Sequence, residues 1–317
     1  MKKNIIKFKG LGIIILILLS NSIKAQFDAI YTQYLFNETF INPAYGGNKE
    51  AMDITLLHRQ QWTAFGGHPV TTAFSIHGPL SQSKMGLGLS ILNDQIGVLN
   101  RNLIYLNYAY RIKLSEKGVL ALGLMGGIDN QTNKFSSLAI NENGVNDDPQ
   151  LAKNGNMIAP NFGTGLFFNN KKFYAGISMP RMIDNQVSFN NLESVTTTKV
   201  DFSKFTYHIT CGNLFTLNES IKLKASGMLK IVQNAPMQFD LNANFLFEET
   251  LWAGLSYRTG SAISALAGIQ INKQFLICYS YDYGLNGTQK YFTGSNEIIL
   301  NYLFSYKGKQ VITPRYF

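Results

Sequence analysis

The sequence predicts an all-β protein: a transmembrane antiparallel β-barrel of about 14 strands, preceded by an N-terminal periplasmic or plug segment. Apolar and polar residues alternate with a period of two along runs of about 9–12 residues, the length of a tilted membrane strand. Short and long connections alternate along the chain. Charged residues make up only 15% of the sequence, while mean hydropathy stays near neutral at -0.02, because lipid-facing and lumen-facing residues average out.

The N-terminus has the pattern of a secretory signal peptide. Several lysines precede Leu11–Leu19, an almost unbroken apolar run that is too short for a spanning helix. Ala25 offers the small residue of a cleavage site. We therefore expect a signal peptide at 1–25, the N-terminal periplasmic or plug segment at 26–52, and an outer-membrane barrel at 53–317.

Strand positions follow from the alternation, as in Ile104, Leu106 and Tyr108, which alternate with Tyr105 and Asn107. Polar residues on the second face, Asp240 and Asp282 among them, are expected to point into a hydrated lumen, although a soluble sandwich would show the same alternation. The predicted strands are 53–62, 70–78, 84–94, 103–114, 118–128, 159–168, 172–180, 204–216, 221–231, 238–247, 250–258, 262–271, 274–283 and 297–307.

Connection lengths separate the barrel from the sandwich. The even-numbered connections are tight, whereas the odd ones are mostly long, with 129–158 and 181–203 the longest. Outer-membrane barrels have short periplasmic turns and long extracellular loops, so we expect the long loops to face outside. Aromatic residues near strand ends suit an interfacial girdle: Tyr279, Tyr281, Tyr283, Tyr302 and Tyr306, with Tyr316-Phe317 closing the last strand.

Composition argues against several function classes. The net charge is +9, of which the leader's five lysines supply +5, leaving +4 and no basic tract for nucleic acid. The four histidines have no metal-ligand spacing, and no nucleophile–base motif appears. We predict no enzyme, cofactor or metal. Cys211 and Cys278 are expected to be buried strand residues, with a disulfide between them as the alternative.

One long loop carries many oxygen ligands. Residues 141–148 read Asn-Glu-Asn-Gly-Val-Asn-Asp-Asp, which lacks the spacing of an EF-hand. A solvated loop is the expected role, and binding of Ca²⁺ or of cargo is the alternative.

Several motifs, in order along the chain, carry a family resemblance. Residues 26–37 read QFDAIYTQYLFN and residues 42–47 read NPAYGG; they are followed by RQQW at 59–62, NDQIG at 93–97 and PRYF at 314–317. The chain resembles the PorP/SprF family, membrane proteins of the type IX secretion system of Bacteroidetes. It departs from the family pattern at Ala29, where proline is frequent, and at Gly46, where alanine is common.

The resemblance implies an outer-membrane component of the secretion and gliding machinery. Such a barrel would be an adaptor between periplasmic ring or motor proteins and secreted surface cargo, either an adhesin or a cargo C-terminal domain. The alternative is an outer-membrane channel for small or hydrophobic solutes, and a further rival is an outer-membrane enzyme.

The aromatic side chains of the N-terminal segment are expected to be shielded from water, either inside the barrel lumen or against a partner. Its candidate partner-binding residues are Tyr31, Gln33, Tyr34, Phe36, Asn42, Pro43 and Tyr45. Three further residues are expected to be structural. Arg59 would be satisfied in the lumen, Trp62 would lie at an interface belt, and Asp94 would only pack; the alternative is that these residues bind something.

Overall fold

The computed structural model describes residues 31–49, 51–64, 66–80, 84–116, 118–137, 154–190, 193–199, 205–232, 235–285 and 293–304. Its strands are β1 (Met52–Gln60), β2 (Val70–Pro79), β3 (Met85–Ile96), β4 (Leu99–Lys113), β5 (Val119–Asn133), β6 (Gly155–Asn169), β7 (Phe173–Met179), β8 (Asp184–Asn190), β9 (Glu193–Lys199), β10 (Thr206–Thr216), β11 (Ile221–Val232), β12 (Gln238–Phe247), β13 (Leu251–Arg258), β14 (Ala262–Gln270), β15 (Phe275–Gly284) and β16 (Ser295–Phe304). Its short 3₁₀ helices are η1 (Tyr34–Phe36), η2 (Glu38–Phe40), η3 (Pro43–Tyr45) and η4 (Phe135–Ser137).

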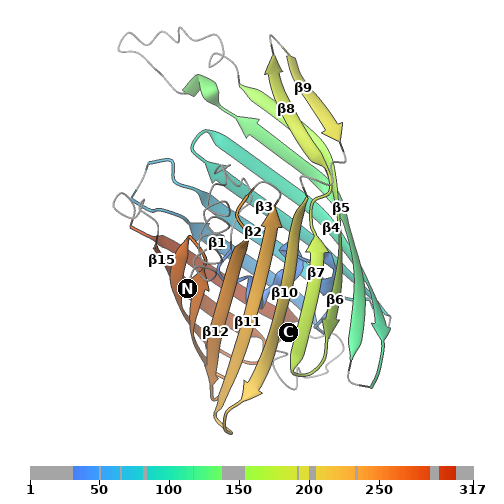
Figure 1. Ribbon diagram of the computed structural model, residues 1–317, viewed down its shortest axis with the longest axis vertical. Helices are drawn as coiled ribbons and strands as arrows, with labels where there is room; N and C mark the ends of the chain where they lie inside the picture. Colours follow the sequence, from blue (N-terminus) through green and yellow to red (C-terminus); the bar gives the residue numbers. More distant parts are fainter. Residues whose placement is uncertain are drawn as a thin grey trace, which may run out of the picture.

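Fourteen of these strands close into one antiparallel barrel, in the order β1-β16-β15-β14-β13-β12-β11-β10-β7-β6-β5-β4-β3-β2 (Figure 1). Closure occurs at β1, where Leu57 lies opposite Ala73 of β2 on one side and Ile299 of β16 on the other. The remaining strands, β8 and β9, form a separate hairpin. The predicted 14-stranded barrel is confirmed, and closure pairs the strand edges that an open sheet would expose.

The two faces of the wall differ as the period of two requires. In β4, Leu106 is 68% exposed on the outer face, while its neighbours Tyr105 and Asn107 are 5% and 1% exposed inside. The same alternation places leucine, isoleucine, phenylalanine and tyrosine on the outside of the other barrel strands. An apolar outer band of this kind suits hydrocarbon rather than water.

In the described part of the chain, no helix combines the length and hydropathy needed to cross a bilayer.

Connections gather at two rims. We call the rim with connections 80–84, 114–118, 170–172, 217–220, 248–250 and 271–274 the short-turn rim. The opposite, long-connection rim has 61–69, 97–98, 134–154, 180–205, 233–237, 259–261 and 285–294. Short and long connections alternate between the rims as predicted, except that 97–98 and 259–261 of the long-connection rim are short.

Two predictions about connections are wrong in detail. The loop expected at 95–102 is a tight turn, because Ile96 pairs with Leu99 and Gly97 supplies the positive φ of 57° that a two-residue hairpin needs. The segment expected to be a plain loop at 181–203 contains the β8–β9 hairpin. Threonine and valine in β9 favour that strand.

The cysteine expectation is half wrong. Both cysteines are free; Cys278 is buried, but Cys211 is exposed. Cys211 falls between the buried Thr210 and Gly212 of β10, so the alternation turns it to the outer face. A thiol is apolar enough to be tolerated against lipid.

Arginine in place of Leu106, the middle residue of β4, is expected to destabilise the barrel by about 2–4 kcal/mol, because it places a charge at the bilayer midplane. Denaturant unfolding of the protein folded into vesicles measures this. Leu217→Arg is the matched control, since Leu217 is 55% exposed in a short connection, where the cost is about 0–1 kcal/mol. Equal costs at the two positions would contradict the assignment of the membrane band.

Candidate functional site

Residues 31–49 lie inside the barrel and are almost all buried. Their local structure follows from two asparagine caps. The Asn37 side chain accepts a hydrogen bond from the Thr39 N–H at 2.9 Å, and the Asn42 side chain accepts one from the Ala44 N–H at 3.0 Å. Pro43, at the start of η3, has no N–H to satisfy. The segment therefore advances in short turns that follow a curved wall. We call residues 31–49 the lumen segment.

The lumen segment makes contacts all the way round the inner wall, so nearly every part of the barrel helps to hold it. In ring order these contacts are Gln33 with Ser280 of β15 and Glu297 of β16, Phe36 with Trp252 of β13, Tyr34 with Asn242 of β12, Leu35 with Lys224 of β11, Glu38 with Thr210 of β10, Ile41 with Ser178 of β7, Asn42 with Leu166 of β6, Gly47 with Arg111 of β4 and with His77 of β2, and Lys49 with Asp53 of β1.

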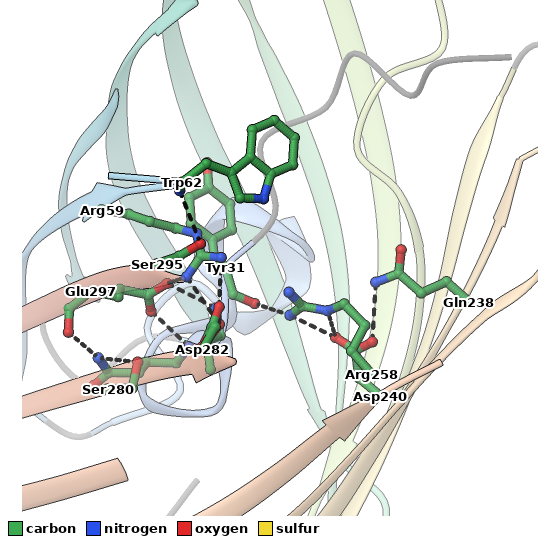
Figure 2. A network of polar contacts seen from close by, with 12 residues as sticks. Tyr31, Arg59, Trp62, Gln238, Asp240, Arg258, Ser280, Asp282, Ser295 and Glu297 are labelled. Atoms are coloured by element: carbon green, nitrogen blue, oxygen red, sulfur yellow. Dashed lines mark hydrogen bonds and ion pairs between the residues drawn. The ribbon is translucent and has the colours of Figure 1, made fainter. Parts of the chain in front are cut away.

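A buried ion-pair network anchors the start of the lumen segment (Figure 2). The Arg59 guanidinium bridges two carboxylates, with Nη2 at 2.6 Å from Asp282 Oδ2 and Nη1 at 3.0 Å from Glu297 Oε2. The Thr32 hydroxyl donates to Asp282 Oδ2 at 2.8 Å. The backbone N–H groups of Thr32 and Gln33 donate to the two oxygens of Glu297, at 2.9 and 2.7 Å. We call these five residues the Arg59 network.

The balance of charge explains why wall and segment depend on each other. One guanidinium faces two carboxylates in the Arg59 network, and each of the three side chains is at most 3% exposed. A buried carboxylate is costly unless further donors complete its hydrogen bonds. Glu297 obtains those donors from the lumen segment, so removing the segment would leave the wall with an uncompensated buried charge.

A second ion pair joins the network from the facing wall. Arg258 Nη2 lies 2.9 Å from Asp240 Oδ2, and the same guanidinium donates to the Tyr31 carbonyl at 2.8 Å. Gln238 donates to the other Asp240 oxygen at 3.0 Å (Figure 2). Two arginines on separate parts of the barrel therefore grip the first residues of the lumen segment.

The other end of the lumen segment is fixed near the short-turn rim. Lys49 Nζ lies 2.5 Å from Asp53 Oδ2, and Asn301 of β16 donates to the other oxygen of Asp53. Arg111 donates to the Gly47 carbonyl at 2.6 Å. These contacts tie the segment to β1, β4 and β16 where it enters the wall.

Glycines in the wall leave room for the lumen segment. A Cβ at Gly86 would lie 2.3 Å from the Gly46 carbonyl oxygen, and a Cβ at Gly123 would lie 2.0 Å from the Ala44 nitrogen. Close approach of the segment backbone is therefore the physical reason for a glycine within each of these strands.

The comparison with known families agrees with this architecture. The family model "Type IX secretion system membrane protein PorP/SprF" matches residues 23–302. The chain belongs to the PorP/SprF family. This PorP/SprF protein is therefore an outer-membrane β-barrel of the type IX secretion system, and membership implies interaction with other components of that system. No curated protein matches the chain.

Solved structures similar to the PorP/SprF barrel are membrane barrels at low identity. The "CymD monoaromatic hydrocarbon channel" has a TM-score of 0.47 and 11% identity, over 88% of this chain and 93% of that one. A Pseudomonas aeruginosa FadL homologue has a TM-score of 0.49 and 10% identity, over 86% and 94%. The P. putida toluene transporter TodX has a TM-score of 0.46 and 10% identity, over 86% and 95%.

The structure places the candidate partner-binding residues of this PorP/SprF chain inside the barrel, in contact with the wall. The Tyr45 ring makes edge-to-face contacts with the rings of His77 and Phe167, each at a centroid distance of 5.4 Å. Partner binding by these side chains stays a prediction, and it would require the segment to leave the lumen. The residues concerned are Tyr31, Gln33, Tyr34, Phe36, Asn42, Pro43 and Tyr45.

The three residues predicted to be structural lie in different settings. Arg59 is at the centre of its network. Asp94, on the lumen side of β3, accepts a hydrogen bond from the Thr71 hydroxyl at 2.5 Å. Trp62 directly follows β1 with a positive φ of 55° and is 42% exposed, and its N–H donates to the Ser295 hydroxyl at 3.4 Å. Its place at an interface belt stays a prediction.

Sequence reasoning missed the partners of Arg59 and the role of Glu38. Asp240 and Asp282 were recognisable as lumen-facing, because they alternate with outward residues, but no sequence signal paired Asp282 with a residue more than 200 positions away. Glu38 is buried in the lumen segment, where it accepts a hydrogen bond from Thr210 at 3.0 Å.

Some predictions fall outside the described residues. These are the signal peptide at 1–25, the loop 141–148, Tyr306 and the terminal Tyr316-Phe317. Among the residues that the structure does describe, no group of three or more His, Cys, Asp and Glu side chains could hold a metal ion.

Replacing Arg59 with alanine should release the lumen segment, because two buried carboxylates lose their cation at a cost of about 3–5 kcal/mol. Limited proteolysis in detergent should then cut within residues 31–49, whereas the wild-type segment stays protected. The triple variant R59M/D282N/E297Q removes every charge of the network and should regain part of the protection. Equal protection in wild type and R59A would contradict an anchoring role.

Docking of the lumen segment is expected to weaken as pH rises towards neutrality. Burial raises the pKa of Glu38 from 4.5 to about 7, while Lys224 opposes that shift. Between these values the docked segment binds more protons than a released one, so raising the pH favours release. Hydrogen exchange of residues 38–45 at pH 5 and pH 7, corrected for intrinsic rates, measures the effect.

Glu38→Gln should lose most of this pH dependence, whereas the exposed control Glu116→Gln should keep it. If hydrogen exchange changes with pH to the same extent in E38Q and in wild type, a group other than Glu38 controls docking of the lumen segment.

Proposed function

We propose that this PorP/SprF barrel is an adaptor that joins periplasmic ring or motor proteins to secreted surface cargo, such as an adhesin or a cargo C-terminal domain. The observation that carries the proposal is the lumen segment, which the wall holds from all sides through buried ion pairs and hydrogen bonds. A wall stiffened from within presents fixed surfaces at its two rims, as an adaptor needs.

The short-turn rim supports a contact with periplasmic components. Short turns face the periplasm in outer-membrane barrels. Exposed lysines gather in and beside the connections of this rim: Lys84, Lys113, Lys171, Lys172 and Lys273. These five lysines outnumber the exposed glutamates of the same turns, Glu116, Glu219 and Glu248. The excess of lysines favours an acidic partner surface and speeds its association.

The long-connection rim supports a contact with cargo. In Figure 1 the β8–β9 hairpin extends beyond the end of the barrel, above the neighbouring strands. Binding elements are commonly carried by loops on a rigid scaffold, and an exposed hairpin offers strand edges to an incoming chain. We therefore assign cargo capture to the hairpin and its neighbouring connections.

The alternative, a channel for small or hydrophobic solutes, has weaker support. Free passage along the lumen would require displacement of residues 31–49, including the ion pairs that hold them. A cavity does lie in the lumen, but it takes up only part of it, and Tyr31, Phe40 and Ile41 of the lumen segment line one side.

Affinity purification from outer membranes, with mass spectrometry of what is recovered, tests the adaptor. Replacing residues 184–199 with a short Gly-Ser linker should remove secreted cargo but retain periplasmic subunits. The charge reversal K171E/K172E should do the opposite. The two variants control for each other, and heat-modifiable migration on SDS gels verifies that each barrel is folded.

Wild-type protein that recovers neither class of partner, but conducts in planar bilayers, would refute the adaptor in favour of the channel.

A further inference from the structure

The lumen contains a cavity of about 90 Å³ between the lumen segment and the long-connection rim. Tyr31, Phe40 and Ile41 of the lumen segment form one side of it. The wall residues come from β3, β4, β5, β10, β11 and β12, together with Pro180 and Arg181, which follow β7.

The lining combines apolar surface with cationic side chains. Leu92, Leu103, Met125 and Met228 supply aliphatic and thioether contacts, and Phe40 adds an aromatic ring. Methionines adapt their shape to irregular apolar ligands. The apolar part of a ligand would therefore pack against these side chains.

Lys230 is the most informative residue of the polar part. It is 4% exposed and lines the cavity. No residue in the described part of the chain accepts a hydrogen bond from its ammonium group or forms an ion pair with it. Asp240, the nearby carboxylate, is bound by Arg258 and Gln238 instead. An ammonium group that faces a largely apolar cavity without a protein acceptor is poorly compensated, so an anion in the cavity would stabilise it.

His208 provides a second unsatisfied group beside the lysine. The two residues lie directly opposite each other in the β10–β11 pair. His208 is 9% exposed, and its Nδ1 has no hydrogen-bond partner. Buried polar atoms are normally satisfied. Two adjacent unsatisfied polar groups lining one cavity point to a ligand that accepts hydrogen bonds.

The other charged side chains of the lining have interactions of their own. Asp94 accepts a hydrogen bond from Thr71, and Arg101, opposite Asp94 in the β3–β4 pair, binds Asp129. Arg181 also has an interaction partner. Lys230 is therefore the cation that a ligand would meet, and a single negative charge is its simplest complement.

We propose that this cavity binds a small carboxylate with an apolar body, the carboxylate on Lys230 and His208 and the body against Met228 and Leu103. This ligand goes beyond the adaptor function, because it occupies the lumen and not the rims. A fatty acid and an apolar peptide chain end are two sources of the same chemistry. The lumen segment forms part of the site, so an occupied cavity would also stabilise the segment in the barrel.

Calorimetric titration of the full-length protein in detergent tests the proposal, with hexanoate as the probe. Hexanol and hexylamine carry the same tail without the carboxylate and should not bind. Among butyrate, hexanoate and octanoate, each added methylene should tighten binding by about fourfold until the cavity is full. N-acetyl-leucine, titrated in parallel, tells a peptide chain end from a fatty acid as the preferred source.

Three variants locate the carboxylate. Lys230→Met should weaken hexanoate binding at least tenfold, whereas Lys230→Arg should retain it within a few-fold. Lys113→Met, at an exposed lysine of β4, is the matched control and should bind like wild type. The two Lys230 changes lie in the lumen and touch neither rim, so recovery of protein partners by K230M and K230R should be unaffected and the two proposals can fail separately.

The proposal is overturned if wild-type protein binds no hexanoate, if hexanol binds as tightly as hexanoate, or if folded K230M binds hexanoate like wild type. The comparison of hexanoate with hexanol is made on wild-type protein, so it decides the matter even if K230M does not fold.

Discussion

The structure depends on the pairing of buried charge on the lumen side of three neighbouring strands, β1, β16 and β15. Arg59 holds Asp282 and Glu297, and the backbone of Thr32 and Gln33 completes the second carboxylate. None of these groups is stable inside a barrel without the others, because desolvation is offset only by a full set of hydrogen bonds. The wall and the lumen segment therefore form one folding unit, although Asp282 and Glu297 are more than 200 positions away from the segment in sequence.

This dependence extends to packing. The lumen segment follows the wall closely enough that glycine is required where backbones meet, as at Gly86 and Gly123. Phe36 packs edge-on against Trp252 at 5.4 Å, which places an aromatic contact beside the polar ones. A barrel filled in this way is rigid without disulfides, and it leaves the two rims and one cavity as the places where other molecules can bind.

Family membership and geometry answer different questions about function. The family match assigns the chain to the type IX secretion system, while the geometry separates three surfaces with different chemistry. The short-turn rim carries exposed lysines, the opposite rim carries the β8–β9 hairpin, and the cavity combines apolar walls with Lys230 and Arg181. Proteins suit the two rims, and a small anion suits the cavity.

The sequence by itself determined the barrel, its strand count and the direction in which most side chains point, because a period of two is a local property of each strand. It also indicated that Asp240 and Asp282 face inward. Only the tertiary structure decided that Asp282 meets Arg59, that Gly97 makes a tight turn instead of a loop, and that the aromatic N-terminal residues fill the lumen. The first and the last of these depend on contacts between residues distant in sequence, which barrel closure brings together and which no local pattern encodes. The turn at Gly97 is local, and it forms because β3 and β4 pair up to Ile96 and Leu99.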